Sequence, residues 1–423
     1  MKRREFIKAA SAGAAGLGAS MIGLDVVAET LEPRVVAPSD EIAVGVIGPG
    51  SRGKSLMRRM LRVPGVRIGA LCDVYEPPLA EGREITGEET PVFDDYRRML
   101  DEATDLDAVL VATPPGLHAA HMTASLERGL HVYGEKIMGF TVDDCNAIAE
   151  AAQRSGKWFQ IGHQYRYAPW YREAVERIRE GEIGEVTHIF GYWHRNYNWR
   201  RPLPDPTLER FINWRLYRDT SAGLLAELGS HHIDVANWVF DEIPESVMGN
   251  GALTFYHDGR NVFDNIQAIF KYPGGGTFVF SSMIGNHKVG YQINIYGTGG
   301  TVELTLQDGA FYYEPARANS AVPEELMERG VNTSASLSTE GDMPYRGPGL
   351  DIQTSEADAD PNLLAVASFF ESIRQNQRPF ADEITGWNSA VPVALGNMAV
   401  RSTTHIPFAD HVSAPTVNMG RGE

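Results

Sequence analysis

The sequence is poor in cysteine, and beyond its first thirty residues it lacks long apolar runs. Only two cysteines, Cys72 and Cys145, occur in 423 residues, and neither has a Cys-x-x-Cys or Cys/His spacing that suggests a metal site. We expect two unpaired, packed thiols rather than a disulfide. After the first thirty residues no segment approaches the roughly eighteen consecutive apolar residues of a membrane span. No membrane anchor is therefore expected.

Positive charge is also scarce. The chain has 38 Lys and Arg against 55 Asp and Glu, and its formal net charge is −17. Nucleic acids and anionic membrane surfaces attract basic faces, so neither is expected as a partner. The length is sufficient for about two or three domains.

The N-terminus has the pattern of an export signal. Two adjacent arginines, Arg3 and Arg4, precede a mild apolar stretch rich in alanine and glycine. This pattern predicts a twin-arginine signal over residues 1–28, cleaved after Ala28, and then a linker over residues 29–40. A short amphipathic helix is the alternative, but the glycines would weaken it. We therefore expect a periplasmic protein that meets the twin-arginine export machinery.

A dinucleotide-binding fingerprint follows an apolar run over residues 42–47. Its members are Gly48, Pro49, Gly50, Ser51, Arg52 and Gly53. The first glycine makes a tight turn, the second lets the backbone approach a pyrophosphate, and the third lets a helix pack on the strand. Asp73 ends a second apolar run, where a carboxylate accepts hydrogen bonds from a ribose diol and repels a 2′-phosphate, which favours NAD over NADP. A glycine-rich turn without a ligand is the alternative.

Strand and helix patterns alternate from this fingerprint to about residue 162. Strands are expected over residues 42–47, 66–72, 108–112, 131–133 and 158–161, with a helix over residues 142–155. Such a series predicts an NAD-binding Rossmann domain, a doubly wound parallel sheet, over residues 41–162.

The pattern then changes to strands separated by turns rich in glycine and proline. Strands are expected over residues 186–193, 262–270, 277–283 and 291–296, with a polar, aromatic insertion over 196–219, a helix over 231–240, a long loop over 314–360, and closing helices over 363–374 and 387–402. This predicts a second α/β domain over residues 163–410 with a large, mainly antiparallel open sheet. Residues 411–423 form a tail. The closing helices are expected to pack back on the Rossmann domain.

The order of several motifs resembles the Gfo/Idh/MocA oxidoreductases, the group of glucose-fructose oxidoreductase and inositol dehydrogenase. The motifs are the fingerprint, Val111-Ala112-Thr113-Pro114-Pro115 with His118, Gly134-Glu135-Lys136, Gly162-His163-Gln164-Tyr165-Arg166, and Glu227-Leu228-Gly229-Ser230-His231-His232-Ile233-Asp234. The resemblance implies a Rossmann domain plus an α/β domain whose open sheet often mediates assembly. It therefore implies a homo-oligomer, a dimer or a tetramer. It adds Thr113, Pro114, His118 and Glu135 to the expected cofactor residues.

The resemblance also assigns a catalytic pair. Lys136 would contact the substrate hydroxyl and stabilise the alkoxide that forms as hydride leaves, and His231 would accept the proton. Glu227 stands where the family has Asp, and it would orient His231 or bind substrate. Ser230 is expected to cap a helix that begins at His231, so that the helix dipole lowers the pKa of the histidine and keeps it neutral.

One departure concerns the residue after the lysine. The proline of the family's Glu-Lys-Pro motif is Ile137 in this chain. In the family that proline can support an unusual Lys-Pro peptide, whereas a cis bond before isoleucine would cost roughly 3 kcal/mol. The Lys136–Ile137 peptide is therefore expected to be trans, or else to be held cis by the site.

The expected substrate residues combine aromatic bodies with polar tips, a combination that suits carbohydrate. They are His163, Arg166, Tyr167, Trp193, His194, Asn196, His232 and Asp234, with Arg195, Tyr197 and Trp199 beside them. Asp234 shares the two roles left open for Glu227, and packing is favoured for His232. Strand completion and an oligomer contact are the alternatives for the aromatic insertion. No His/Asp/Glu cluster has convincing metal spacing.

These patterns predict an exported NAD-dependent carbohydrate oxidoreductase that acts on a secondary hydroxyl of a sugar or glycoside. Because free NAD is expected to be scarce outside the cytoplasm, the cofactor should stay tightly bound. The alternatives are an NAD-dependent glycoside-cleaving enzyme, which oxidises transiently, eliminates and reduces, and a nucleotide-retaining sensor or scaffold without chemistry. An intact Lys136 and His231 pair argues against the last.

Overall fold

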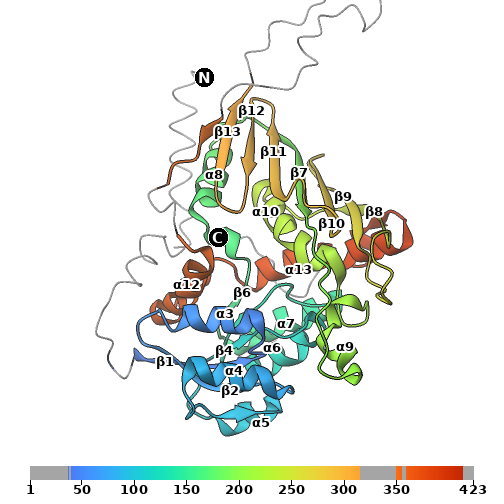
Figure 1. The fold of residues 1–423 in the computed structure, drawn as a ribbon. Coiled ribbons are helices and arrows are strands. Elements are labelled where there is room, and N and C mark those ends of the chain that lie inside the picture. Colours follow the sequence, from blue (N-terminus) through green and yellow to red (C-terminus); the bar gives the residue numbers. More distant parts are fainter. Residues whose placement is uncertain (1–36, 38–39, 315–348, 355–358, 413–423) are drawn as a thin grey trace, which may run out of the picture.

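A computed structural model describes residues 37, 40–314, 349–354 and 359–412 (Figure 1). The expected export signal, all but two residues of the linker, most of the long loop and nearly all of the tail lie outside these residues. Among the described residues, no helix is both long and apolar enough to cross a membrane.

The N-terminal half contains a six-stranded, fully parallel sheet with the strand order β3-β2-β1-β4-β5-β6. Its strands are β1 (Ile42–Ile47), β2 (Val66–Cys72), β3 (Val92–Phe93), β4 (Ala108–Val111), β5 (His131–Gly134) and β6 (Phe159–Ile161). Every residue of β1, β4 and β6 is buried, because helices cover both faces of the sheet. Those helices are α3 (Ser51–Met60), α4 (Glu76–Thr86), α5 (Tyr96–Glu102), α6 (His118–Glu127) and α7 (Val142–Ser155). The predicted Rossmann fold is confirmed. Both cysteines are buried and free.

The second half is built on a nine-stranded sheet with the order β14-β13-β12-β11-β7-β10-β9-β8-β15. Its strands are β7 (Val186–His194), β8 (Ser246–Ala252), β9 (Asn265–Lys271), β10 (Thr277–Met283), β11 (Tyr291–Gly297), β12 (Gly300–Leu304), β13 (Gly309–Tyr313), β14 (Leu350–Asp351) and β15 (Ile406–Pro407). Only β7 and β10 pair in parallel, so the predicted mainly antiparallel sheet is confirmed.

One strand begins later than expected. The apolar run from residue 262 predicts a strand start there, but β9 starts at Asn265. The carboxylate of Asp264 accepts hydrogen bonds from the backbone N–H groups of Thr254, Phe255 and Tyr256. Asp264 therefore closes the loop between β8 and β9, and regular strand pairing begins after it.

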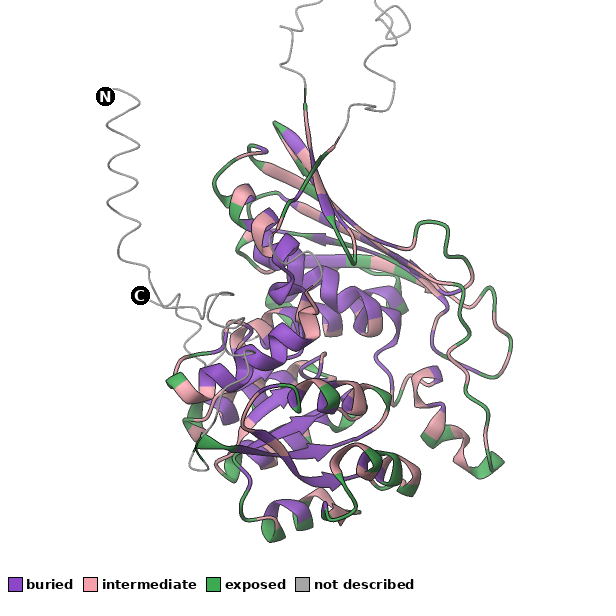
Figure 2. Ribbon diagram, turned by 60° about the vertical axis from the view of Figure 1, so that its left-hand side comes forward, coloured by how far each residue is buried: buried purple, intermediate pink, exposed green. Residues whose placement is uncertain are grey.

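Helices cover one face of the large sheet. α8 (Pro169–Arg179) and α10 (Ser230–Phe240) lie against this face, as Figure 1 shows. Strand residues alternate between buried and less buried positions along β9, β10 and β11, and Figure 2 shows buried and less buried residues interspersed along the strands of this sheet. The open face exposes apolar side chains that include Met248, Ile269 and Tyr296.

The closing helices α12 (Pro361–Gln375) and α13 (Glu383–Ser402) return to the Rossmann domain. Arg52 of α3 donates to the side chain of Asn362 in α12, and Arg59 pairs with Asp360 just before it. α13 lies between α7 and β8. The two halves are thus tied together beside the fingerprint helix.

Candidate active site

A cavity of about 360 Å³ opens where the carboxyl ends of the Rossmann strands meet the second sheet. Its lining residues are Arg52, Ala112, Thr113, Pro115, Glu135, Lys136, Gln164, Trp193, Arg195, Tyr197, Trp199, Arg201, Trp214, Arg215, Glu227, Leu228 and His231. Ligands of open α/β folds bind at this edge of the sheet. The cavity brings both halves of the chain together around Lys136 and His231.

The glycines of the fingerprint have the geometry that a dinucleotide needs. Gly48 has a φ of +88°, and a Cβ on Gly53 would lie 2.3 Å from the carbonyl oxygen of Gly48. A Cβ on Gly50 would meet nothing within 4 Å, so the space beside this residue is open to a phosphate. No side chain caps α3, which begins at Ser51, and its first N–H groups can therefore bind an anion. These residues fit the pyrophosphate of NAD.

Asp73 lies at the carboxyl end of β2, next to the fingerprint. Its side chain is half buried, and one carboxylate oxygen accepts a hydrogen bond from the backbone N–H of Tyr75 at 2.9 Å. Burial raises the pKa of Asp73, while the backbone hydrogen bonds act in the opposite direction. The place of this carboxylate, after the second strand of the sheet, is the one that recognises an NAD ribose.

The loop after β4 forms the next part of the cavity wall. Thr113 lines the cavity, as does Pro115, whereas its neighbour Pro114 does not. His118 is fully buried, and its two ring nitrogens lie 2.6 Å from the carbonyl oxygen of Ile137 and 2.8 Å from that of Thr113. His118 therefore joins this loop to the segment after Lys136 rather than facing the cavity.

Glu135 and Lys136 follow β5. Glu135 is buried, and its Oε1 atom accepts a hydrogen bond of 2.8 Å from Nε of Arg52 and lies 2.8 Å from Nη2 of the same guanidinium in an ion pair. Lys136 donates from Nζ to the carbonyl oxygen of Glu227 at 2.8 Å and more weakly to that of Ala226 at 3.4 Å. Burial lowers the pKa of Lys136, and the charge of Glu227 opposes this. The Lys136–Ile137 peptide is cis.

The helix that carries His231 starts earlier than expected. Residues 223–240 are helical, and residues Leu225–Gly229 form a π-turn inside this helix. Ser230 does not cap an N-terminus, because its hydroxyl donates to the carbonyl oxygen of Ala226. The prediction of a helix start at His231 is therefore wrong. A π-turn widens the helix locally, and here it is the carbonyls of this turn that accept from Lys136.

His231 nevertheless has the expected environment for a base. It lines the cavity, is only 5% exposed, and its Nδ1 atom has no hydrogen-bond partner among the residues that the structure describes. Burial lowers the pKa of His231 well below its usual value, and the charge of Lys136 adds to this effect. The imidazole is therefore neutral, as a general base requires, but the cause is burial and not a helix dipole.

Glu227 lies in the π-turn and lines the cavity beside Lys136. Its carboxylate pairs with Arg215 at 3.0 Å. Burial raises the pKa of Glu227, but the charges of Arg215 and Lys136 outweigh it, so that the net pKa is lowered. Glu227 is ionised and held by Arg215, a residue that the motifs did not indicate.

Several expected substrate residues lie outside the cavity, in the packing around it. Arg166 and Asp234 form a buried ion pair with N–O distances of 2.9 Å. Tyr167 accepts from the backbone N–H of Ala381. His232 is buried, with Nε2 3.2 Å from the carbonyl oxygen of Tyr192. None of the four lines the cavity, and each already has a partner within the fold.

His163 lies directly against His231. It is buried, its Nε2 lies 2.8 Å from the hydroxyl of Ser389, and its ring lies at 5.6 Å from the ring of His231. The contact is edge-to-face, with an angle of 85°. His163 packs behind His231 and does not itself line the cavity.

Strand alternation divides the expected residues around β7. Trp193, Arg195 and Tyr197 line the cavity, whereas His194 bonds Ser281 in the neighbouring strand and Asn196 is exposed. Successive side chains of an extended segment point to opposite faces. The structure thus places His194 and Asn196 away from the cavity, and the alternation itself was a signal that separates them from Arg195 and Tyr197.

The insertion over residues 196–219 supplies the outer wall. It contributes Trp199, Arg201, Trp214 and Arg215 to the lining. Trp199 has a φ of 55°, a left-handed conformation that is rare for a large side chain. Of these four residues, the sequence predicted only Trp199 as a site residue. Arg201, Trp214 and Arg215 belong to no recognisable motif.

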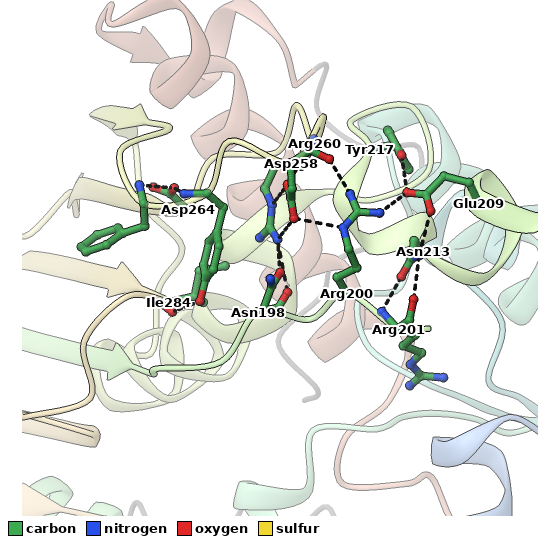
Figure 3. A network of polar contacts seen from close by, with 12 residues as sticks. Asn198, Arg200, Arg201, Glu209, Asn213, Tyr217, Asp258, Arg260, Asp264 and Ile284 are labelled. Carbon is green, nitrogen blue, oxygen red and sulfur yellow. Dashed lines mark hydrogen bonds and ion pairs between the residues drawn. The ribbon is translucent and has the colours of Figure 1, made fainter. Parts of the chain in front are cut away.

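A polar network fastens this wall to the loop between β8 and β9 (Figure 3). Arg200 pairs with Asp258 of that loop and with Glu209 of the short helix α9 (Glu209–Ile212). The same Asp258 pairs with Arg260, whose guanidinium also bonds Asn198. The network fixes the backbone on both sides of Trp199.

Two family models match the chain. The model of the oxidoreductase family with the NAD-binding Rossmann fold, GFO_IDH_MocA, matches residues 42–163. The model of the GFO/IDH/MocA C-terminal domain matches residues 171–303. Together the two matches cover more than half of the chain.

Curated relatives are similar at low identity. The putative oxidoreductase YteT of Bacillus subtilis is 26% identical over 325 residues, covering 61% of this chain and 71% of that protein. Inositol 2-dehydrogenase of Rubrobacter xylanophilus is 28% identical over 295 residues, covering 69% and 79%. A glycosyl hydrolase family 109 protein of Shewanella baltica is 28% identical over 236 residues, but the match covers 52% of this chain and only 50% of that protein.

Solved structures share the fold. Levoglucosan dehydrogenase in complex with NADH and levoglucosan has a TM-score of 0.69 at 18% identity, covering 87% of this chain and 99% of that one. Aldose-aldose oxidoreductase from Caulobacter crescentus has a TM-score of 0.68 at 20% identity, with the same coverage. The motifs, the fold and the family models agree, and the chain belongs to the Gfo/Idh/MocA family of NAD-binding oxidoreductases.

Proposed function

We propose that the protein oxidises a secondary hydroxyl of a sugar or glycoside, with NAD as the hydride acceptor and Lys136 and His231 as the catalytic pair. The observation that carries this proposal is the meeting of Lys136 and His231 in one cavity beside the dinucleotide cradle. Lys136 comes from the Rossmann sheet and His231 from the second domain. Neither half alone has both groups.

The two residues have complementary tasks. When bound, NAD supplies the acceptor for a hydride from the carbinol carbon. The neutral imidazole of His231 accepts the hydroxyl proton. Lys136 uses hydrogen bonds to the π-turn carbonyls to fix its ammonium group, and an ammonium has three protons. A remaining proton can therefore bond the substrate oxygen and stabilise the developing alkoxide.

Glu227 contributes charge rather than proton transfer. It is ionised, and Arg215 holds it at the cavity wall. Burial lowers the pKa of Lys136 and so favours loss of its proton, whereas the negative charge of Glu227 raises this pKa and favours the ammonium form. We assign Glu227 and Arg215 as residues that keep the ammonium group charged and in place.

A carbohydrate substrate is supported by the rest of the lining. Trp193, Tyr197, Trp199 and Trp214 present aromatic surfaces beside arginine side chains. Aromatic faces pack on the apolar faces of sugar rings, and charged groups bond their hydroxyls. The relatives named as inositol 2-dehydrogenase and levoglucosan dehydrogenase support the same class of substrate.

An alternative reaction uses the same cavity. If the ketone formed by oxidation labilises a neighbouring C–H bond, elimination of a glycosidic group and return of the hydride would cleave a glycoside without net redox change. The similarity to a glycosyl hydrolase family 109 protein favours this as the second candidate. That match spans half of the relative, so the leading proposal remains net oxidation.

Export, retention of the cofactor and assembly belong to the same proposal. The twin-arginine pattern of residues 1–28 supports periplasmic export, and a cofactor loaded before export must then stay bound.

The exposed apolar residues Ile269 and Tyr296 on the open sheet face support assembly through that face. Ile269→Asp is expected to reduce the assembly state in light scattering, and an unchanged mass would contradict the assignment.

Product analysis tests the reaction directly. The mature protein is purified, its bound nucleotide is identified, and a panel of sugars and glycosides is offered while NADH and products are measured. NADH that accumulates in step with a keto-sugar supports the dehydrogenase. Cleavage without NADH supports the redox-neutral reaction, and failure to bind any nicotinamide nucleotide contradicts both.

A further inference from the structure

The cavity is cationic although the chain is acidic. Five cationic and two acidic side chains line it, whereas the formal net charge of the chain is −17. Two of the cations have carboxylate partners, because Arg52 pairs with Glu135 and Arg215 pairs with Glu227. The other three cations of the lining, Lys136, Arg195 and Arg201, have no such ion pair within the described residues.

Two of these three cations, Lys136 and Arg201, can be assigned to the proposed chemistry and to the cofactor. Lys136 bonds the π-turn carbonyls, and its proposed role is to stabilise the alkoxide of the substrate. Arg201 lies near Lys54 of α3, where its charge adds to burial and to Arg58 in lowering the pKa of Lys54. The charge of Arg201 therefore reaches the fingerprint helix, whose N-terminus is the expected place of the cofactor phosphates. Arg195 remains.

Arg195 is held in the cavity by its place in the fold. Its backbone N–H donates to the carbonyl oxygen of Met283 at 2.8 Å, which continues the line of β7. Its guanidinium lies over the ring of Trp193, 4.9 Å from the centroid. The ring of Trp193 in turn lies 5.7 Å from that of His231. One side chain, that of Trp193, thus separates Arg195 from the proposed base His231.

Arg195 has no carboxylate partner within the described part of the chain. No ion pair there joins its guanidinium to an acidic side chain, although the residue is half buried. Burial lowers the pKa of Arg195, and the charge of Glu227 opposes this only in part. A cation without a partner loses hydration on burial, and an anionic ligand would restore the balance.

We propose that Arg195 binds the carboxylate of an acidic sugar, so that the preferred substrates are hexuronates or glycosides of hexuronic acids. This inference rests on the proposed function, because it names the substrate class of the same cavity. The planar guanidinium forms two parallel hydrogen bonds with a carboxylate. Trp193 and Tyr197, two positions before and two positions after Arg195 in the chain, also line the cavity and provide aromatic surface for the sugar ring.

Equilibrium binding to the NADH-loaded protein tests the inference without turnover. The probes are glucose, galactose and mannose, each with its hexuronate, and glucose 6-phosphate as a different anion. Quenching of tryptophan fluorescence or calorimetry reports affinity. At least one hexuronate should bind roughly ten- to hundredfold more tightly than its hexose, as expected for a hydrogen-bonded charge pair. Equal affinity in all three pairs would overturn the inference, and so would a preference for glucose 6-phosphate over every hexuronate.

Variants identify the residue responsible. Arg195→Gln should reduce the ratio of hexuronate to hexose affinity to near one, and Arg195→Lys should retain part of it, because an ammonium group lacks the planar fork. Arg218 is the matched control, since its guanidinium lies over the ring of Phe263, 4.3 Å from the centroid and outside the cavity. Arg218→Gln should keep the wild-type ratio. An unchanged ratio in Arg195→Gln would overturn the assignment.

Turnover separates this inference from the proposed function. Tight, Arg195-dependent binding of a hexuronate that never reduces bound NAD would retain the anion site and contradict the dehydrogenase. Reduction of bound NAD by neutral hexoses, with no preference for hexuronates, would retain the dehydrogenase and overturn the anion site.

Discussion

The ammonium group of Lys136 donates a hydrogen bond to the backbone carbonyl oxygen of Glu227, 2.8 Å away. This bond joins the strand end of the Rossmann sheet to a π-turn in the second domain. The same turn leads into His231, so this one contact links the two residues of the proposed catalytic pair across the interface between the two halves.

Loss of the ammonium group should abolish most of the activity. Lys136→Met keeps the apolar volume but removes the charge that stabilises the alkoxide, and it should lower kcat by roughly 10²–10³-fold. NAD affinity should change little, because the cradle is formed by the fingerprint. Steady-state kinetics and NAD titration check this, and a variant that retains wild-type kcat would refute the role of Lys136.

The base assignment predicts a particular pH profile. Since burial lowers the pKa of His231 well below its usual value, the imidazole stays neutral below pH 6.5, roughly the ordinary histidine value. The acid limb of kcat/KM should therefore lie below that pH. His231→Asn should lower kcat by roughly 10²–10⁴-fold. If the acid limb persisted unchanged in His231→Asn, the limb would report the protonation of another group and not of His231.

Arg215 should act through Glu227. Arg215→Gln removes the cation that counters burial, so the pKa of Glu227 should rise and its protonation should occur nearer neutral pH. We expect lower kcat and an acid limb displaced to higher pH, with partial recovery in Arg215→Lys. If Arg215→Gln changed KM alone and left the pH profile in place, Arg215 would be a substrate contact instead.

Asp73 should determine the choice of nucleotide. Asp73→Ser removes the acceptor for the ribose hydroxyls and the repulsion of a 2′-phosphate, so the preference for NAD over NADP should fall by tenfold or more. Titration of both nucleotides measures it. Glu76, a more exposed acid at the start of α4, provides a control, because Glu76→Ser should leave the preference almost unchanged.

Folding stability should fall as the pH drops below about 6.5. The pKa is lowered, with burial as the main cause, for each of the histidines His118, His121, His131, His163, His231 and His232. For three of them, His121, His131 and His232, it falls to about 4. Between the folded and unfolded values the unfolded chain binds more protons, so each group contributes up to about 1.4 kcal/mol of lost stability per pH unit. Urea unfolding at pH 7 and 5 tests the sign, and equal midpoints would contradict it.

Local signals account for the part of the fold that the sequence predicted. The buried strand β1, the glycines of the fingerprint and Asp73 all lie within about thirty residues of one another. Their signals are therefore readable from a short stretch of sequence. β3, with only two residues, and β8, which contains two glycines, have weaker patterns. Their pairing is decided by neighbouring strands.

Long-range contacts explain the differences at the site. The π-turn before His231 presents its carbonyls to Lys136, about ninety positions earlier in the chain. The local sequence favoured a helix that starts after Ser230, and this prediction was wrong because it could not include so distant a contact. Arg166 forms an ion pair with Asp234, which lies in a separate helix, and neither side chain lines the cavity. In contrast, the division between Arg195 and His194 follows from strand alternation, which the sequence already contains.

The most direct test of the account is a double-mutant cycle on Lys136 and His231, measured as the single-turnover rate of NAD reduction with an accepted sugar. Lys136→Met and His231→Asn should each cause a large loss, and the double variant should lose little more than the worse single variant, because both residues act on one hydroxyl. Losses that multiply, or full turnover in both single variants, would contradict the catalytic pair.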